Sequence, residues 1–136
     1  MSQWTYVNAI FRLEGHFKKI SNEELVDIFG KSVDAYDVDK LEYNEDWELK
    51  NKEKYLPVGT EGSLKMKIWR ESNLTSMSAT TVSIFGDLRD FYNLKEIEEW
   101  FNRCCDKLPL RQAVCQVDNG RHEKIFYRSH LTEGNL

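Results

Sequence analysis

The sequence predicts an α+β fold whose elements follow one another as βαββαβ, the order of a ferredoxin-like sandwich, with an extra C-terminal strand. Three observations support this prediction. Two segments start with a capping box and then carry apolar residues at helical spacing. Other segments alternate apolar and polar residues, as half-buried strands do. Near the end of the chain, the Asn119-Gly120 pair is a strong signal for a β-hairpin with a type I′ turn. Two helices would then cover one face of an antiparallel sheet.

The first strand is expected at residues 4–14, and it carries apolar side chains on both faces. Such a strand is typical of the centre of a sheet that is covered on each side. The first helix is expected to begin after the N-cap Ser21, because Glu24 three residues later completes a capping box. Gly30 is a natural end for this helix.

Two further strands are expected in the middle of the chain, at residues 64–71 and at about 76–85. In the first of them the side chains alternate between the core and the solvent. The inward residues are Leu64, Met66 and Ile68, and the outward residues are Lys65, Lys67 and Trp69.

The second helix has the clearest amphipathic pattern of the sequence. A charged turn at 86–90 is expected to lead into it, Asn93 is its expected N-cap, and Pro109 stops it. Strands at 111–117 and 122–128 complete the predicted sheet. The apolar positions of the helix are Ile97, Trp100, Phe101, Cys104, Cys105 and Leu108, which is the spacing of one buried face.

Length and composition are typical of one soluble domain. The 136 residues are expected to form a single domain, with an acidic insertion at 31–58 and a flexible tail at 129–136. The chain is 40% hydrophobic and 31% charged, and no apolar run is long enough to span a membrane. The net charge of −4 argues against direct nucleic-acid binding, because such binding needs a basic surface.

The cellular setting is inferred from the first residues and the cysteines. The N-terminus lacks the basic and apolar regions of a signal peptide. The thiols of Cys104, Cys105 and Cys115 have neither a disulfide framework nor metal-ligand spacing, so they are expected to be core residues. We therefore expect a reduced, cytoplasmic setting, and no cofactor.

The charged turn at 86–90 is the sharpest candidate for a ligand site. It is expected between a strand end and a helix start, where backbone N–H groups and the helix dipole favour anions. Arg89 would add a bidentate contact to a phosphate or carboxylate. In the alternative interpretation the turn is structural, and Arg89 pairs with Asp87 or Asp90. The full candidate ligand-binding set is Asp87, Arg89, Asp90, Asn93 and Trp69.

The acidic insertion is the candidate partner site. The segment Asp37-Val38-Asp39 resembles the start of a calcium loop, but the glycine and the final glutamate of such a loop are misplaced. A metal is therefore not expected. The insertion is either a solvated acidic face or a negative patch that meets a basic partner. The candidate partner-binding residues are Asp37, Asp39, Glu45 and Asp46.

Aromatic side chains are expected to gather on the sheet face away from the helices. Such a face can stack bases, bind a ligand or pair with another copy. Burial in a homodimer or under the insertion is favoured, because monomers rarely expose large apolar patches. The glycine-rich segment 59–63 precedes a strand rather than a helix, which favours a plain turn over a phosphate-binding loop. The expected aromatic residues of this face are Trp4, Tyr6, Trp69 and Phe85.

Four short stretches together carry a resemblance to a group of known proteins. They are Trp4-Thr5-Tyr6-Val7, Glu61-Gly62-Ser63-Leu64, Gly86-Asp87-Leu88-Arg89-Asp90 and Glu99-Trp100-Phe101. The set resembles small uncharacterised proteins encoded by phages and prophages of Gram-positive bacteria. The resemblance covers the strands and helices but not the acidic insertion. It implies an intracellular accessory protein that counters host defence, and it brings no catalytic residues.

The sequence thus favours a non-enzymatic binding module that forms a homodimer. In the first hypothesis, the acidic insertion covers a basic surface on a host protein. In the second, the chain sequesters a small anionic, nucleotide-like ligand through Arg89 and the helix start at Asn93. In the third, it is an enzyme of small phosphorylated substrates, with Asp87 and Asp90 as acid/base or metal-binding groups.

Overall fold

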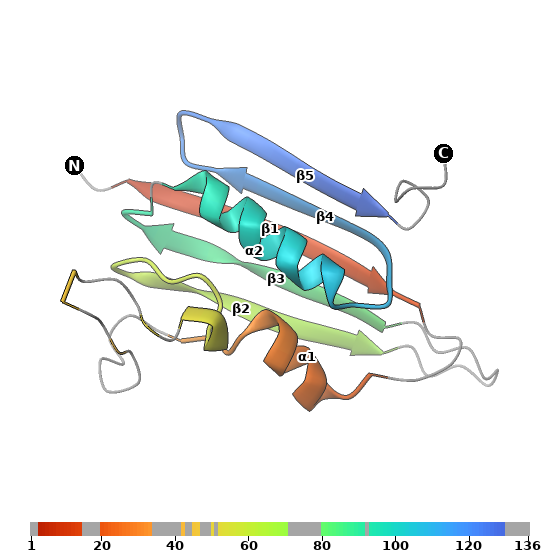
Figure 1. The fold of residues 1–136 in the computed structure, drawn as a ribbon. Coiled ribbons are helices and arrows are strands. Elements are labelled where there is room, and N and C mark those ends of the chain that lie inside the picture. The colour runs from red at the N-terminus through yellow and green to blue at the C-terminus, as the bar shows by residue number, and fades with distance from the viewer. Residues whose placement is uncertain are drawn as a thin grey trace.

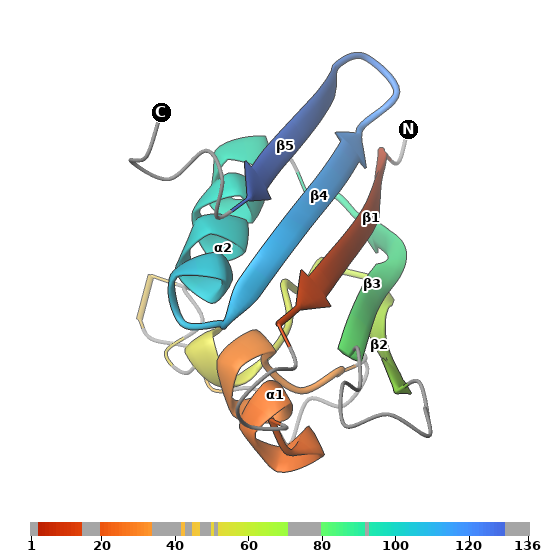
Figure 2. The ribbon, with the colours of Figure 1, turned by 90° about the vertical axis from the view of Figure 1, so that its right-hand side faces the viewer.

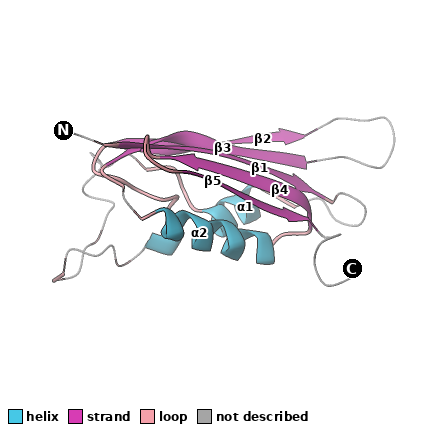
Figure 3. Cartoon of the chain, turned by 90° about the horizontal axis from the view of Figure 1, so that it is seen from above, coloured by secondary structure: helices cyan, strands magenta, loops and turns pink. Residues whose placement is uncertain are grey.

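The computed structural model describes residues 3–14, 20–33, 42, 45–46, 50, 52–70, 80–91 and 93–129. These residues form a five-stranded antiparallel sheet with two helices on one of its faces (Figures 1 and 3). Across the sheet the strand order is β2-β3-β1-β4-β5. In chain order the elements are β1 (Trp4–Leu13), α1 (Asn22–Phe29), the 3-10 turn η2 (Lys52–Lys54), β2 (Gly62–Arg70), β3 (Thr80–Arg89), α2 (Leu94–Asp106), β4 (Leu110–Asp118) and β5 (Glu123–Ser129).

The predicted ferredoxin-like βαββαβ sandwich is wrong. The structure has a five-stranded antiparallel sheet in the order β2-β3-β1-β4-β5, with two helices in the described part of the chain. The outermost strand β5 pairs with β4 from end to end, with Glu123 opposite Asp118 and Ser129 opposite Gln112. Alternating residues predict where strands lie along the chain, and most of those positions are confirmed. They do not predict which strands pair, because pairing depends on contacts between residues distant in sequence.

The central position of β1 is confirmed. It lies between β3 and β4, and its odd-numbered side chains from Thr5 to Leu13 are all buried. In this row, the ring of Phe11 packs against Phe29 of α1 and Phe101 of α2, with centroid distances of 4.7 and 5.5 Å. One side chain of β1 therefore joins both helices to the sheet, and its burial contributes about 1.5–3 kcal/mol.

The two helices contact each other where α1 ends, and both lie on the same side of the sheet (Figure 2). The start of α1 is as predicted, because the N–H of Glu24 donates to the Ser21 hydroxyl at 3.1 Å. At its other end, the indole N–H of Trp100 donates to the carbonyl oxygen of Phe29 at 3.1 Å. A side chain of α2 thus satisfies a backbone group that a helix end leaves without an intrahelical partner.

The hairpin between β4 and β5 is confirmed, but its predicted type I′ turn is wrong. That turn needs positive φ at both central residues, and of the Asn-Gly pair only Gly120 has one, at 86°. Instead, residues 119–122 form a longer loop held by side chains. The Asn119 side-chain oxygen accepts hydrogen bonds from the N–H groups of Arg121 and His122, at 3.0 and 2.7 Å. Asparagine commonly closes turns in this way.

The two ends of the predicted 31–58 insertion carry buried residues, and Leu56 belongs to the hydrophobic core of the fold. Lys31 and Tyr55 form a parallel β-bridge, and Val33 and Leu56 are buried. The tail is predicted to start at Ser129, but this residue is the last of β5 and is buried.

Candidate functional site

Residues 86–90 were expected to form a turn, and this prediction is wrong for most of the segment. β3 continues to Arg89, and Leu88 is buried on the same side as Val82 and Ile84. These three apolar residues are separated by two and four positions, so they share one face of a strand. This pattern is the signal in the sequence that the strand continues. Asp87 and Arg89 therefore lie on a strand and not at the start of a helix.

The glycine of this segment allows a close approach between two strands. A Cβ atom at Gly86 would lie 2.2 Å from the carbonyl oxygen of Ser63 on β2. No side chain can occupy that position without moving β2. Gly86 therefore marks a crowded strand pair, although in the sequence it suggests a turn.

Arg89 is held by carboxylates of the protein itself. Its Nη1 lies 2.9 Å from Glu61 Oε2, and its Nε lies 3.8 Å from Asp90 Oδ2. The structural interpretation of this segment anticipated the contact with Asp90, but Glu61 was missed because it belongs to the entry of β2. An incoming anion would have to displace a carboxylate from this guanidinium, which does not favour Arg89 as a ligand site.

Asp90 joins the ends of three strands. It adopts a left-handed backbone conformation with φ 55°, and its N–H donates to the carbonyl oxygen of Gln3 at 2.7 Å. Its carboxylate accepts a hydrogen bond from the Thr60 hydroxyl at 3.1 Å. The N–H of Thr60, within the glycine-rich segment 59–63, donates to the carbonyl oxygen of Arg89 at 3.0 Å. This segment therefore has a structural role: it leads into β2 and is hydrogen-bonded to the end of β3, in agreement with the plain-turn interpretation.

The five predicted ligand-binding residues do not converge. Asn93 directly precedes α2, but its side chain makes no capping hydrogen bond. Trp69 is 54% exposed on β2, where Lys67 Nζ lies 4.4 Å from its ring centroid. The register places Trp69 opposite Thr81 and Ser63 opposite Asp87, at the two ends of the β2–β3 pair. The indole is thus remote from the charged residues it was expected to assist.

The predicted partner-binding residues are only partly within the described structure. Asp37 and Asp39 lie outside the described residues. Glu45 and Asp46 are described and both are exposed. Their role in binding a basic partner stays a prediction.

The sheet face opposite the helices is the most unusual surface of the described chain. All of its exposed large apolar side chains lie on this one face, and no helix of the described residues covers it (Figure 3). We call this surface the open face. Its apolar members, with their exposed fractions, are Tyr6 (52%), Ile10 (47%), Trp69 (54%), Phe85 (43%), Val114 (37%), Ile125 (64%) and Tyr127 (57%).

The strand register orders the open face into rows. Ile10, Val114 and Tyr127 lie side by side across β1, β4 and β5. The next row toward the start of β1 contains Phe85 and Ile125. The side chains of the first row are in contact distance, because they lie directly opposite each other on paired strands. In the second row, Asn8 and Gln116 separate Phe85 from Ile125.

The charges of the open face are separated along the strands. Three carboxylates share the row of Tyr6, at one end of the sheet, whereas the cations lie in the other rows. The carboxylates belong to Asp87, Asp118 and Glu123, and the cations to Lys65, Lys67 and Arg12, with Arg89 in the row of Trp4, where it is paired with Glu61.

Sequence reasoning found part of this surface. Tyr6, Trp69 and Phe85 are confirmed as exposed residues of the open face. Trp4 is only half-buried, and its ring lies against Gly62. The aliphatic and C-terminal members were missed, although apolar residues on both faces of their strands were a usable signal. They are Ile10, Val114, Ile125 and Tyr127.

The thiols of the chain are buried, as predicted, and they are expected to be weak nucleophiles. Burial raises the pKa of Cys104 and of Cys115 to about 12, and that of Cys105 to about 11. Because the thiolate is the nucleophile, these values do not favour cysteine catalysis near neutral pH. Within the described ranges, no three histidine, cysteine or acidic side chains are grouped so that they could hold a metal ion.

Comparisons with protein-family models, with curated proteins and with solved structures found no match to this chain. The resemblance to phage-encoded proteins therefore stays a prediction. Among the residues that the structure describes, no helix is both long and apolar enough to cross a membrane.

Proposed function

We propose that the chain is a non-enzymatic binding module that acts by protein–protein contact, and that a second copy of the chain covers the open face. The observation that supports this proposal is the gathering of all seven exposed large apolar side chains of the described residues on that face. Monomeric proteins seldom expose an apolar patch of this kind, and such patches mark interaction sites.

The charge pattern favours a second copy as the occupant. A twofold axis in the plane of the interface and perpendicular to the strands would reverse the order of the rows. It would place the carboxylate row of one copy over the row of Arg12 in the other, and it would bring the apolar rows together. A twofold interface uses the same patch twice, so the carboxylate row of each copy meets Arg12 of the other.

Analytical ultracentrifugation over a wide concentration range tests this proposal. We expect a dimer for the wild-type chain and a largely monomeric Ile10→Gln/Ile125→Gln variant. Burying an isoleucine contributes about 1.5 kcal/mol or more, so losing two per protomer weakens the dimer by well over tenfold. Lys124→Gln is the matched control, because Lys124 is exposed on the same strand but points to the opposite side.

Two outcomes would contradict the proposal. One is a wild-type chain that stays monomeric at every concentration. The other is equal weakening by the control and by the isoleucine variant while circular dichroism shows both to be folded.

Of the two binding hypotheses drawn from the sequence, one remains to be tested and the other is not pursued. The contact between a basic host protein and the acidic residues remains a prediction, to be tested by reversing the charges of Glu45 and Asp46. The ligand site at Arg89 is not proposed again, because Glu61 and Asp90 already contact its guanidinium.

A further inference from the structure

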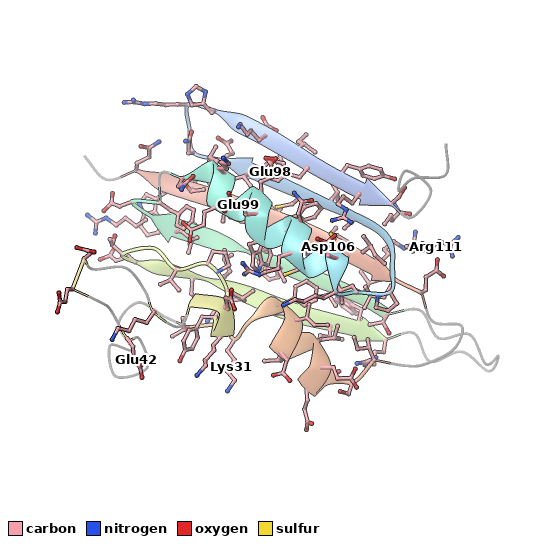
Figure 4. All side chains as sticks on the ribbon, viewed as in Figure 1. Lys31, Glu42, Glu98, Glu99, Asp106 and Arg111 are labelled. Carbon is pink, nitrogen blue, oxygen red and sulfur yellow. The ribbon has the colours of Figure 1, made fainter. Side chains whose placement is uncertain are left out.

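A cavity of about 470 Å³ opens on the helical side of the molecule, away from the open face. Three segments surround it: the last turn of α1, the residues around η2, and the end of α2. Figure 4 shows Lys31 beside η2 and the end of α1. The lining residues that matter below are Lys31, Lys54, Tyr55, Arg103 and Lys107, with Asp27 and Glu53 at the same cavity.

The cavity is positively charged in a chain whose net charge is −4. Its lining holds four cationic and two acidic side chains, so 4 − 2 gives a net charge of +2. Among the described residues, no ion pair engages any of the four cations, whereas Arg89 and Arg128 each pair with a carboxylate. Like charges around a concave surface raise the local potential and attract anions.

The helix dipole explains only part of this cluster. Arg103 and Lys107 lie one turn apart at the end of α2, where cations are generally favoured. Lys31 and Lys54 are brought to the same place by a non-helical contact. The N–H of Lys31 donates to the carbonyl oxygen of Lys54 at 2.8 Å, and the carbonyl oxygen of Lys31 accepts from the N–H of Leu56 at 2.9 Å.

The walls of the cavity are fixed by direct backbone contacts. Gly30 has φ 105°, and a Cβ atom there would lie 2.4 Å from the carbonyl carbon of Tyr55. The end of α1 therefore packs directly onto the backbone that carries Lys54 and Tyr55. The hydrogen bond from Trp100 to Phe29 holds α2 against the same end. A ligand would meet a preformed site, which lowers the entropic cost of binding.

The cavity also has an apolar wall. Val26, Ile28 and Tyr55 line it and are half-buried. Its volume is in the range of small-molecule sites and exceeds what a bare phosphate needs. An aromatic ring beside a group of cations is suited to an anion that also carries a planar organic part.

We infer that this cavity binds a phosphorylated small molecule with a planar organic group, of the class of nucleoside diphosphates. The phosphates lie among Lys31, Lys54, Arg103 and Lys107, and the organic part packs against Tyr55. This site goes beyond the protein contact proposed above, and it uses the opposite side of the molecule.

Isothermal titration calorimetry at low salt tests the inference, with adenosine diphosphate, pyrophosphate and adenosine as probes. We expect saturable binding of adenosine diphosphate, weaker binding of pyrophosphate and no measurable binding of adenosine. The Lys31→Gln/Lys54→Gln variant is expected to weaken adenosine diphosphate binding at least tenfold, or about 1.4 kcal/mol. Both lysines contribute to the fold through backbone hydrogen bonds, so the variant is expected to remain folded.

Lys95→Gln/Lys124→Gln is the matched control. It removes the same charge from two exposed lysines that lie neither at the cavity nor on the open face. Its affinity for adenosine diphosphate is expected to change by less than about twofold, as distant surface charges are screened. The inference is overturned if the wild-type chain shows no saturable binding, or if both variants weaken binding equally. Neither result bears on dimerisation, which is measured separately.

Discussion

At the scale of single residues, burial decides the chemistry of the three thiols. Each side chain lies in the core, and the folded state therefore favours the neutral thiol over the thiolate. The consequence is a testable difference between the folded and the unfolded chain.

We expect iodoacetamide at pH 8 to label Cys104, Cys105 and Cys115 slowly in buffer and rapidly in urea, as read by mass spectrometry. The unfolded thiol has a pKa near 9, and burial raises it to about 11 or 12 in the folded chain. As pH rises above 9, the unfolded chain releases protons that the folded chain retains. The free energy of unfolding therefore falls, by up to about 1.4 kcal/mol per pH unit for each thiol. Labelling of any of the three in buffer at the unfolded rate would contradict this.

The residue scale also shows where sequence reasoning ends. The burial of Cys104 and Cys105 followed from helical spacing and that of Cys115 from its place in a predicted strand, and all three were predicted correctly. The partner of Arg89 could not be predicted, because Glu61 reaches it only once β2 pairs with β3. Charges within a few residues of each other are visible in a sequence, whereas those brought together by strand pairing are not.

At the scale of elements, the end of α1 depends on a glycine that other residues can replace only at a cost in stability. Gly30→Ala is expected to lower the free energy of unfolding by roughly 2 kcal/mol or more, because a positive φ and a clash with Tyr55 act together. Urea denaturation measures the change.

Gly120→Ala separates these two causes. Gly120 also has a positive φ, of 86°, but a Cβ atom there would meet nothing within 4 Å. We expect a loss of only about 1 kcal/mol, from the backbone conformation alone. Equal losses in the two variants would show that the contact between Gly30 and Tyr55 adds nothing to stability.

The predicted elements were correct where local rules decide and wrong where pairing decides. The start of α1 followed from the Ser21 capping box, and its hydrogen bond is present. Residues 86–90 look like a turn because of their glycine and charges, but pairing with β2 and β1 keeps them extended. Asn119-Gly120 correctly marked a hairpin, although the neighbouring side-chain hydrogen bonds selected a longer loop.

At the scale of the whole molecule, the row arrangement of the open face predicts a charge-swap experiment. In the proposed dimer Arg12 of one copy faces the row that contains Asp118 of the other. We expect Arg12→Glu to weaken the dimer at least tenfold, and Arg12→Glu/Asp118→Arg to recover most of the affinity. Sedimentation equilibrium of the two variants and the wild type provides the measurement. A double variant weaker than the single one would exclude this orientation.

The order of the strands has a consequence for how the protein is made. Of the five strands of this sheet β1 is synthesised first, yet its two neighbours are β3 and β4, and β4 ends only at Asp118. At about 5–20 residues per second, β1 waits for several seconds with apolar side chains and unpaired backbone groups. During synthesis it is therefore the segment most in need of protection by a chaperone. Because the central strand is translated before its partners, formation of this sheet depends on the order of synthesis as well as on the stability of the fold.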